Sequence, residues 1–240
     1  MFKAFRACCL SLSFVNSTQA MGQDWLSVNG GETITIETTQ NILMRASQPK
    51  GSILLLTGGD GRLNVSADAR FSDGATNVLI RNRDAFRDKG FNVLLVELGT
   101  NLTAATDFMA GLKRPVTIVA TSKGTQRAAE GLRQGARPDK LVLTSGFLSK
   151  ESGPTKSVAA ILGKSALLPT TLVIHHPEDN CRFTKPVGVA PFREWAGASA
   201  EVKWLSGGSE QGNPCTFSAH HGFAGQDAEL VALIADFADQ

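Results

Sequence analysis

The stretch Pro115–Thr125, which reads Pro-Val-Thr-Ile-Val-Ala-Thr-Ser-Lys-Gly-Thr, decides the fold of this chain. Its first half is a continuous apolar run of the kind found in buried strands, and a helical segment begins at its end. Between the two lies a small-x-Ser-x-Gly pattern, which permits a sharp turn that lifts the Ser122 hydroxyl clear of the sheet. Ala120 stands where this pattern usually has its first glycine. The alternative is that Ser122 only caps the helix, but the place of this junction in the series of strands favours the sharp turn.

Similar apolar runs recur before and after this stretch. Their apolar residues are consecutive rather than alternate, which is typical of parallel strands covered by helices on both faces. The runs are Ser52–Thr57, Phe91–Val96, Lys140–Thr144, Thr170–His175 and Glu201–Leu205. Ahead of them, Thr33–Thr38 alternates polar and apolar residues, and Ile42–Ala46 can pair with it as a hairpin. The sequence therefore predicts a mostly parallel sheet with leading antiparallel strands.

Three segments between the strands have the pattern of helices. Val78–Lys89 places apolar residues broadly on one face and ends at Gly90, a good helix terminator. Thr125–Arg133 and Asp227–Phe237 are the other two. We therefore predict a single doubly wound α/β domain over residues 21–240. Residues 144–168 are its only spare segment, which is long enough for a minimal cap and no more.

The amino end has the pattern of a targeting segment. Lys3 and Arg6 form a basic start, Ala7–Val15 is a short and mostly apolar stretch, and small residues occupy Thr18 and Ala20, where a signal peptidase acts. We interpret residues 1–20 as a cleaved signal peptide; the alternative is an amphipathic helix. Export predicts a periplasmic or secreted protein, in a compartment where disulfides form.

Composition excludes several classes of function. Of 240 residues, 42% are hydrophobic and 19% are charged, so the chain can bury a core. No apolar run is long enough for a spanning helix, which argues against integral membrane association. The net charge is only +2, and no basic patch with interleaved aromatics predicts nucleic-acid binding. The chain has no tyrosine, which rules out a Tyr acid or base.

A glycine-rich loop, Thr57–Gly61, follows the first long apolar run. Glycines let the backbone approach a ligand and aim its N–H groups, as the stabilisation of an oxyanion requires. Glycine loops also bind phosphates. However, this loop lacks Lys and Ser/Thr in Walker spacing, and Asn64 stands where a dinucleotide fingerprint needs its third glycine. A plain glycine-rich turn is the remaining alternative.

All four histidines lie in two adjacent pairs, His175-His176 and His220-His221. The first pair ends a predicted strand, and Asp179, with Glu178 as its rival, follows at the carboxyl edge of the sheet. A histidine of the second pair can meet a carboxylate there, in the chain order Ser, Asp, His. The pairs also suggest a metal site, because histidine is the commonest zinc ligand. Their spacing fits no zinc motif, and that interpretation leaves the Ser122 turn unexplained.

From about residue 50 to its end, the chain resembles α/β-hydrolase-fold serine hydrolases, and especially small or exported proteobacterial α/β hydrolases of unassigned substrate. The resemblance rests on Leu54–Leu63, Asn82–Phe86, Gly90–Val93, Ala120–Thr125, His175–Cys181 and His221–Phe223. It implies Ser122 as nucleophile in a nucleophile elbow, Asp179 as acid and His221 as base. His221 is favoured over His220 because the histidine of the family precedes Gly-Phe. The chain departs from the family at Ala120 and in the brief segment 101–112, which is expected to reshape the mouth of the pocket.

The resemblance implies a carboxylesterase-like serine hydrolase that cleaves an ester or related acyl bond of a small molecule, without cofactor, metal or obligate protein partner. The backbone N–H groups of Gly59 and Lys123 are the expected oxyanion hole. A catalytically silent binding protein and a metal-dependent hydrolase are the alternatives. Fold does not determine substrate, so thioesters, amides and peptides stay open. Val158–Leu168 either lines a pocket or, as the pattern favours, forms an ordinary packed helix.

The catalytic hypothesis also predicts a disulfide. Cys181 lies two residues after Asp179, and Cys215 lies six residues before His221. If the acid and the base meet, the same two loops bring these cysteines together. The alternative is two buried free thiols, because nothing in the sequence fixes the Cβ directions that a bridge requires.

Overall fold

The computed structural model describes Met1 and residues 24–240, so the predicted signal peptide lies outside the described residues except for Met1. An eight-stranded sheet forms the centre of the molecule, with strand order β10-β9-β8-β7-β4-β6-β3-β2. Its strands are β2 Gly31–Ile36, β3 Thr39–Met44, β4 Gly51–Leu56, β6 Phe91–Leu95, β7 Val116–Thr121, β8 Lys140–Thr144, β9 Thr170–His175 and β10 Ala200–Trp204. Strands β4 to β10 of this sheet are parallel, whereas β2 and β3 pair antiparallel at one edge. The predicted fold class is therefore confirmed.

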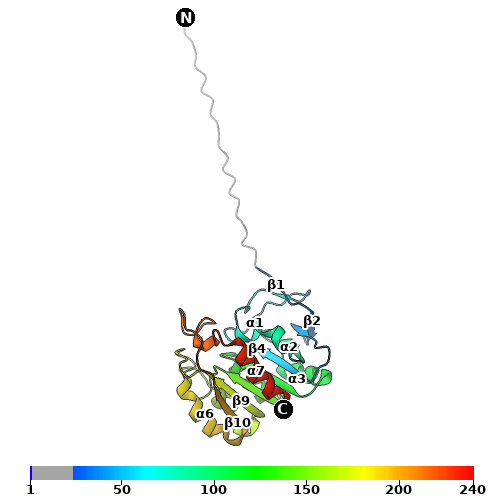
Figure 1. The fold of residues 1–240 in the computed structure, drawn as a ribbon. Coiled ribbons are helices and arrows are strands. Elements are labelled where there is room, and N and C mark those ends of the chain that lie inside the picture. The colour runs from blue at the N-terminus through cyan, green and yellow to red at the C-terminus, as the bar shows by residue number, and fades with distance from the viewer. Residues whose placement is uncertain (2–23) are drawn as a thin grey trace.

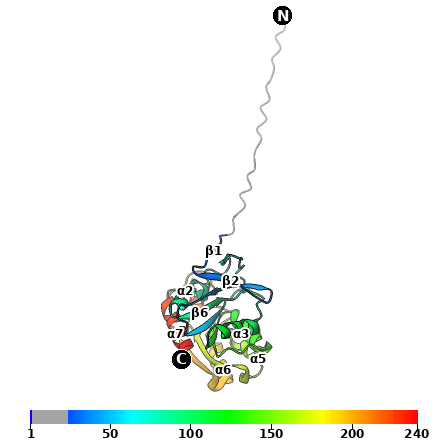
Figure 2. The same cartoon turned by 90° about the vertical axis from the view of Figure 1, so that its right-hand side faces the viewer.

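Helices cover both faces of the sheet (Figures 1 and 2). They are α1 Val78–Arg81, α2 Arg83–Asp88, α3 Leu102–Leu112, α4 Gly124–Gln134, α5 Val158–Leu162, α6 Val189–Ala196 and α7 Asp227–Asp239. Helices α1, α2 and α7 share a core with one face of the sheet, and α3 to α6 share a core with the other. Figure 2 shows α2 and α7 on one side of β6 and α3 and α5 on the other. A separate small sheet pairs β1, Leu26–Ser27, with β5, Arg70–Phe71.

The two cores follow from the alternation of side chains along each strand. In β4, Leu54 and Leu56 enter the core beneath α3 and α4, whereas Ile53 and Leu55 enter the core beneath α1 and α7. All four are fully buried. Because both faces of the strand are covered, most of its residues are apolar, which explains the continuous apolar runs in the sequence.

The predicted helix Val78–Lys89 is in fact two helices, and this part of the prediction is wrong. The break falls at Asn82, whose backbone leaves the helical region with φ −101° and ψ 10°. The Asn82 side-chain amide donates to the carbonyl of Val78 at 2.8 Å and to Asp227 Oδ1 at 2.7 Å. Asparagine competes with the backbone in this way in many turns, so this polar contact with α7 fixes the break.

The spare segment, residues 144–168, forms no separate cap. Its helix α5 buries Val158, Ile161 and Leu162 in the core that it shares with α4. The stretch Val158–Leu168 is thus mainly packed structure. Only Phe147 and Thr155 from the spare segment reach the clefts described below.

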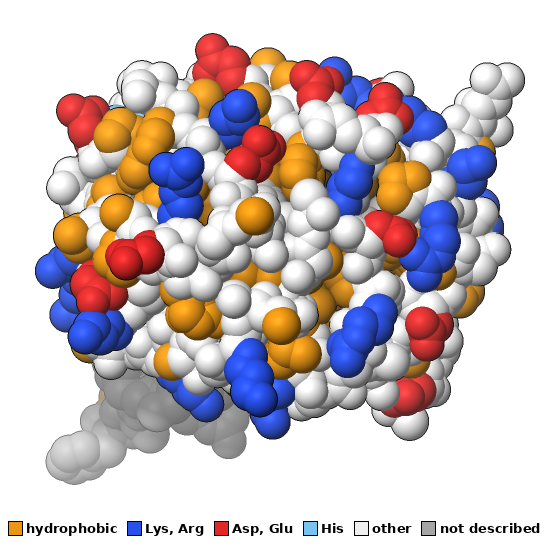
Figure 3. Space-filling view, turned by 90° about the horizontal axis from the view of Figure 1, so that it is seen from below, with side chains coloured by type: hydrophobic (Ala, Val, Ile, Leu, Met, Phe, Trp, Pro, Cys, Tyr) orange, Lys and Arg blue, Asp and Glu red, His pale blue; other side chains and the backbone are white. Residues whose placement is uncertain are grey.

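The described part of the chain has no helix whose length and apolar character would let it cross a membrane. Figure 3 shows one face of the molecule, on which basic and acidic side chains are intermingled rather than gathered by sign. This face therefore offers no basic surface of the kind that binds a phosphate backbone.

Candidate active site

Strand β7 runs directly into helix α4 through a sharp turn at Ser122. The backbone of Ser122 is left-handed, with φ +52°, and its N–H donates to the carbonyl of Thr144 at 3.0 Å. A glycine is required at position 124, because the turn brings the start of α4 close to the end of β4. A Cβ on Gly124 would clash with the carbonyl oxygen of Leu56. Ala120, by contrast, is buried within β7, and its methyl group fits the core there.

The structure brings Ser122, His221 and Asp179 together in one hydrogen-bonded chain. His221 Nε2 lies 3.0 Å from Ser122 Oγ, and His221 Nδ1 lies 3.0 Å from Asp179 Oδ2. Asp179 follows β9, and His221 lies in a 3₁₀ turn, His220–Gly222, before α7. Asp179 is only 2% exposed and His221 6% exposed. Three loops at the carboxyl edge of the sheet thus supply a hydroxyl, an imidazole and a buried carboxylate, and the imidazole is hydrogen-bonded to both of the others.

The Asp179 carboxylate is held by two further donors. The Cys181 N–H donates to Oδ1 at 2.9 Å, and the Thr184 hydroxyl donates to Oδ2 at 3.1 Å. Thr184 Oγ1 also lies 3.0 Å from His221 Nδ1. Sequence reasoning missed Thr184, because nothing in the sequence indicates that the loop after Asp179 turns back on itself.

His175 lies on the far side of the same carboxylate. Its Nδ1 donates to the carbonyl of His176 at 3.2 Å, and its Nε2 lies 4.0 Å from Asp179 Oδ2. Burial lowers the pKa of His175 below its ordinary value, although the nearby Asp179 charge acts in the opposite direction. A neutral His175 leaves His221 as the partner that hydrogen-bonds to Asp179.

Glu178 and His220, the alternatives to Asp179 and His221, lie outside the hydrogen-bonded chain that contains Ser122. The Glu178 N–H donates to His176 Nδ1 at 3.0 Å, and the Glu178 side chain is exposed. The His220 ring stacks on the His176 ring, with centroids 4.0 Å apart, and its Nδ1 lies 3.1 Å from Glu210 Oε2. The geometry thus separates Asp179 from Glu178 and His221 from His220.

The histidine pairs are poorly suited to hold a metal ion. His176 Nε2 donates to the carbonyl of Gly207 at 2.9 Å, and its Nδ1 accepts the Glu178 N–H, so both ring nitrogens are engaged. His221 likewise uses both nitrogens. A third potential ligand, Cys181, is oxidised in a disulfide. In the group His176, Glu178 and His220, whose potential ligand atoms lie within 4.8 Å of one another, His176 thus has no free ring nitrogen to offer.

The predicted disulfide is present between Cys181 and Cys215, with their Cα atoms 4.6 Å apart. It links the loop after β9, which carries Asp179, to the loop before α7, which carries His221. The structure thus favours the bridge over the alternative of two free thiols.

The glycine loop after β4 lies directly against the elbow. A Cβ on Gly58 would come within 2.8 Å of Ser122 Cβ, so only glycine allows this approach. Gly59 is left-handed, with φ +63°. Among residues 24–240, the N–H groups of Gly59 and Lys123 donate to no protein acceptor. Both amides are thus available beside Ser122.

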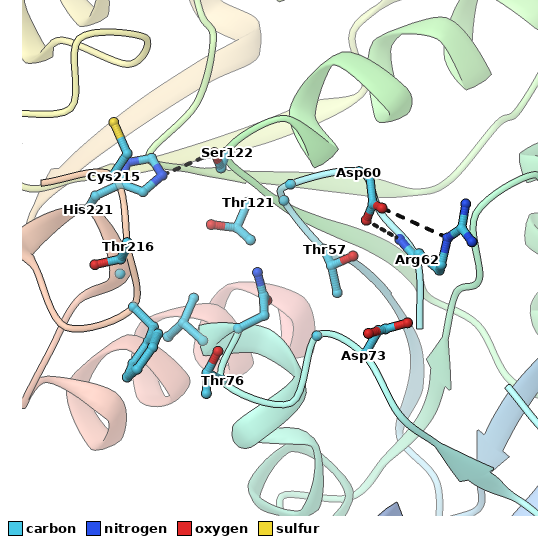
Figure 4. A pocket seen from close by; sticks show the side chains of 17 residues that line it. Thr57, Asp60, Arg62, Asp73, Thr76, Thr121, Ser122, Cys215, Thr216 and His221 are labelled. Carbon is cyan, nitrogen blue, oxygen red and sulfur yellow. Dashed lines mark hydrogen bonds and ion pairs between the residues drawn. The ribbon is translucent and has the colours of Figure 1, made fainter. Parts of the chain in front are cut away.

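Two clefts meet at Ser122. The first has a volume of about 500 Å³ and is lined by the loops 57–62, 73–78 and 215–217 together with His221. Figure 4 shows Ser122 and His221 at one end of it and Asp60, Arg62 and Asp73 at the other. The second, of about 380 Å³, is lined by Phe147, Phe183 and the disulfide among others. Segment 101–112, which forms α3, lines neither cleft, so the expectation that it reshapes the mouth is wrong.

Solved structures with a similar fold are numerous. The esterase domain of a Rhodothermus marinus protein is 13% identical, with a TM-score of 0.56, and the match covers 89% of this chain and 98% of that one. A Xanthomonas campestris α/β serine hydrolase without a lid is 10% identical, with a TM-score of 0.55 and coverage of 87% and 97%. A Pyrococcus furiosus esterase is 12% identical, with a TM-score of 0.58 and coverage of 86% and 88%. No family model and no curated protein matches the sequence.

At these identities the likeness establishes the fold. Its extent, together with the strand order and the position of the elbow after β7, shows that the chain has the α/β-hydrolase fold of serine hydrolases and esterases.

Proposed function

We propose that the protein is a serine hydrolase that cleaves an ester or related acyl bond of a small molecule, in the manner of a carboxylesterase. One observation carries this proposal: the continuous hydrogen-bonded chain from Ser122 Oγ through His221 to Asp179. A serine hydroxyl is a weak nucleophile unless a positioned base takes its proton. The neighbouring clefts give a substrate access to that hydroxyl.

The reaction proceeds through an acyl-enzyme. Ser122 Oγ attacks the carbonyl carbon while its proton passes to His221 Nε2, and the carbonyl oxygen becomes an oxyanion. The bond to the leaving oxygen then breaks as His221 returns the proton to it, which releases an alcohol. Water next attacks the acyl-enzyme, with its proton again taken by His221, and the acid is released with Ser122 restored. Asp179 orients the imidazole and stabilises its charged form throughout.

The oxyanion is held by backbone N–H groups in this proposal. Gly59 and Lys123, whose amides are free, line the second cleft together with Ser122, one from the glycine loop and one from the start of α4. Each such donor contributes on the order of 3 kcal/mol to transition-state stabilisation. The helix amino terminus adds a favourable field for the negative charge.

We further propose that the protein acts in the periplasm or outside the cell, after cleavage of residues 1–20. The Cys181–Cys215 disulfide supports this location, because such bonds persist in oxidising compartments. Purification of the exported protein and its amino-terminal sequence would test the site of cleavage.

Covalent labelling at Ser122 tests the proposed chemistry. A fluorophosphonate probe should label the wild-type protein and a Ser47→Ala control, whose changed serine lies outside both clefts. Ser122→Ala should lose labelling and hydrolysis of p-nitrophenyl esters, at an unchanged melting temperature. Full hydrolysis by a folded Ser122→Ala protein would contradict the proposal, and so would a wild-type protein inert to probe and esters, which would indicate a silent binding protein.

A further inference from the structure

The two clefts that meet at Ser122 differ in chemistry. The first cleft is lined by a mixture of polar and apolar surface in nearly equal parts, and most of its lining side chains can form hydrogen bonds. The polar lining consists of Thr57, Asp60, Arg62, Asp73, Thr76, Asn77, Thr121 and Thr216, and the apolar lining of Val78, Cys215 and Phe217. A group that fills this cleft must therefore offer both hydrogen bonds and apolar contact.

The first cleft presents acceptors and donors together. Asp73 lines the cleft below Arg62 (Figure 4), and within residues 24–240 it forms no ion pair, whereas Arg62 pairs with Asp60. Asn77 uses its side-chain oxygen to cap α1, so its amide N–H₂ faces no competing acceptor there. A hydroxyl group both donates and accepts, so several hydroxyls match this lining. With Asp60 and Asp73 against Arg62, the cleft also disfavours an anion.

Phe217 stands at the rim of the first cleft and is 51% exposed. A large exposed aromatic ring beside a polar cleft offers a flat face for C–H groups, because the face carries negative charge density. A sugar ring has C–H groups on its faces and hydroxyls on its edges. Phe217 and the polar floor thus supply both kinds of contact that such a ring makes.

The second cleft has a largely apolar lining. The Phe147 and Phe183 rings lie 6.4 Å apart with an angle of 23° between their planes, and they form one aromatic wall beside the disulfide. Phe147 is 7% exposed, so its ring is fixed by packing. A compact apolar group fits this wall, whereas a polar group there would lose hydrogen bonds to water.

His221 decides which part of a substrate occupies which cleft. The leaving oxygen must lie within hydrogen-bond reach of His221 Nε2 to receive its proton. His221 lines the first cleft, whereas the second is lined by Gly59, Ser122 and Lys123 on its catalytic side. The leaving group therefore belongs in the polar cleft and the acyl group against the phenylalanines.

We infer that the substrate is an ester between a polyhydroxylated alcohol, such as a sugar, and a compact apolar acid that packs on Phe147 and Phe183. This inference rests on the proposed function. Hydrolysis releases the uncharged polyol into the polar cleft and the acid from the aromatic one. Esters of simple alkyl alcohols leave the polar lining of the first cleft without partners and are poorer substrates.

A pair of esters that share an acid and differ in their alcohol tests the preference for a polyhydroxylated leaving group. Methyl 6-O-benzoyl-glucoside and n-butyl benzoate both release a primary alcohol, so they differ in hydroxyls rather than in bond type. We expect kcat/KM at least tenfold higher for the glucoside ester. Asp73→Asn and Phe217→Ala should each lower this ratio about fivefold. Asp107→Asn and Phe108→Ala, matched exposed residues on α3 outside both clefts, should leave it unchanged.

A second pair of esters, which share a leaving group and differ in their acid, tests the assignment of the acyl cleft. Phe183→Ala should reduce kcat/KM for p-nitrophenyl benzoate relative to p-nitrophenyl acetate by about tenfold, whereas Phe108→Ala should not. An unchanged ratio in Phe183→Ala would overturn the assignment of the acyl cleft.

The proposed function is tested separately with p-nitrophenyl benzoate. It is supported if the wild-type protein hydrolyses this ester and Ser122→Ala does not. If that holds but wild-type enzyme prefers n-butyl benzoate or treats both benzoates alike, the inference alone is wrong. It is also wrong if Asp73→Asn and Phe217→Ala behave like their α3 controls. If no ester is hydrolysed and no probe labels Ser122, the proposed function fails, and the inference fails with it.

Discussion

Ser122 combines a reactive hydroxyl with a left-handed backbone, and the second feature has a cost. At φ +52° an L-residue is strained by roughly 1–2 kcal/mol, whereas glycine avoids this strain. We therefore expect Ser122→Gly to have a free energy of unfolding about 1 kcal/mol higher than that of Ser122→Ala. Both variants lack the hydroxyl, so urea unfolding compares the relief of backbone strain in glycine with the larger conformational entropy that glycine loses on folding. Equal stabilities would show that the strain at Ser122 is no larger than this entropy cost and would contradict the prediction.

The two adjacent histidines should behave very differently on mutation. His221→Ala removes the base that contacts Ser122 and should lower kcat by at least about 10³-fold. His220→Ala removes a ring that stacks on His176 and should change kcat less than about tenfold. Steady-state kinetics on one p-nitrophenyl ester gives both values. A reversed order would transfer the role of base to His220.

Thr184 is a positioning residue, because its hydroxyl contacts both Asp179 and His221 within the buried part of the site. Thr184→Val keeps the shape and removes the hydroxyl, so kcat should fall roughly 10- to 100-fold, as a hydrogen bond to a charged group contributes about 1.5–3 kcal/mol. KM should change little, and Thr184→Ser should recover most of kcat. Equal activities of the Val and Ser variants would leave Thr184 with a packing role only.

The residues of the site differ in how far the sequence predicts them. Ser122 is marked by a local pattern, since the strand, the small residues and the helix are contiguous. Asp179 and Glu178 are adjacent carboxylates, and only the path of the loop decides which one turns inward. His221 is favoured over His220 through resemblance alone. Thr184 carries no signal at all, because its contacts depend on a loop that folds back over five residues.

At the scale of elements, the disulfide joins the two loops that carry Asp179 and His221. The bridged cysteines are 34 residues apart, and closing a loop of this length stabilises the fold by roughly 3 to 4 kcal/mol in the chain-entropy model. Reduction should therefore lower both the free energy of unfolding and kcat. Intact mass after alkylation without reductant, followed by kinetics with and without reductant, checks this. Unchanged kcat after complete reduction would show that packing alone holds the loops together.

Strands are more predictable than helices in this chain. Buried parallel strands need apolar residues on both faces, so β4, β6, β7, β8 and β9 are visible as continuous runs. Helices α1 and α2 look like one helix in the sequence because their apolar face continues across Asn82, whose contact with α7 is not local. The mixed sequence of α3 gives no clear pattern, although Leu102, Ala105 and Met109 bury one face of it.

At the scale of the whole molecule, one sheet with two cores places every candidate catalytic group at the same edge. The elbow, the glycine loop, the acid and the base follow β7, β4, β9 and β10, and parallel strands end on one side. The doubly wound arrangement is predictable from the alternation of strands and helices. The shapes of the clefts are not, because they depend on how loops from distant parts of the chain pack together.

Whole-molecule stability should depend on pH through His175. Burial lowers the pKa of His175 in the folded protein, so it stays neutral there, whereas in the unfolded chain it takes up a proton below its ordinary value of about 6.5. Stability from this group is therefore fully present above about pH 6.5 and is lost as the pH falls toward the lowered pKa. His175→Gln keeps a side-chain donor and does not titrate. Urea unfolding at pH 7.5 and pH 5.0 should show a smaller loss of free energy of unfolding in this variant than in the wild type. Equal losses would mean that other groups carry the acid sensitivity of the fold.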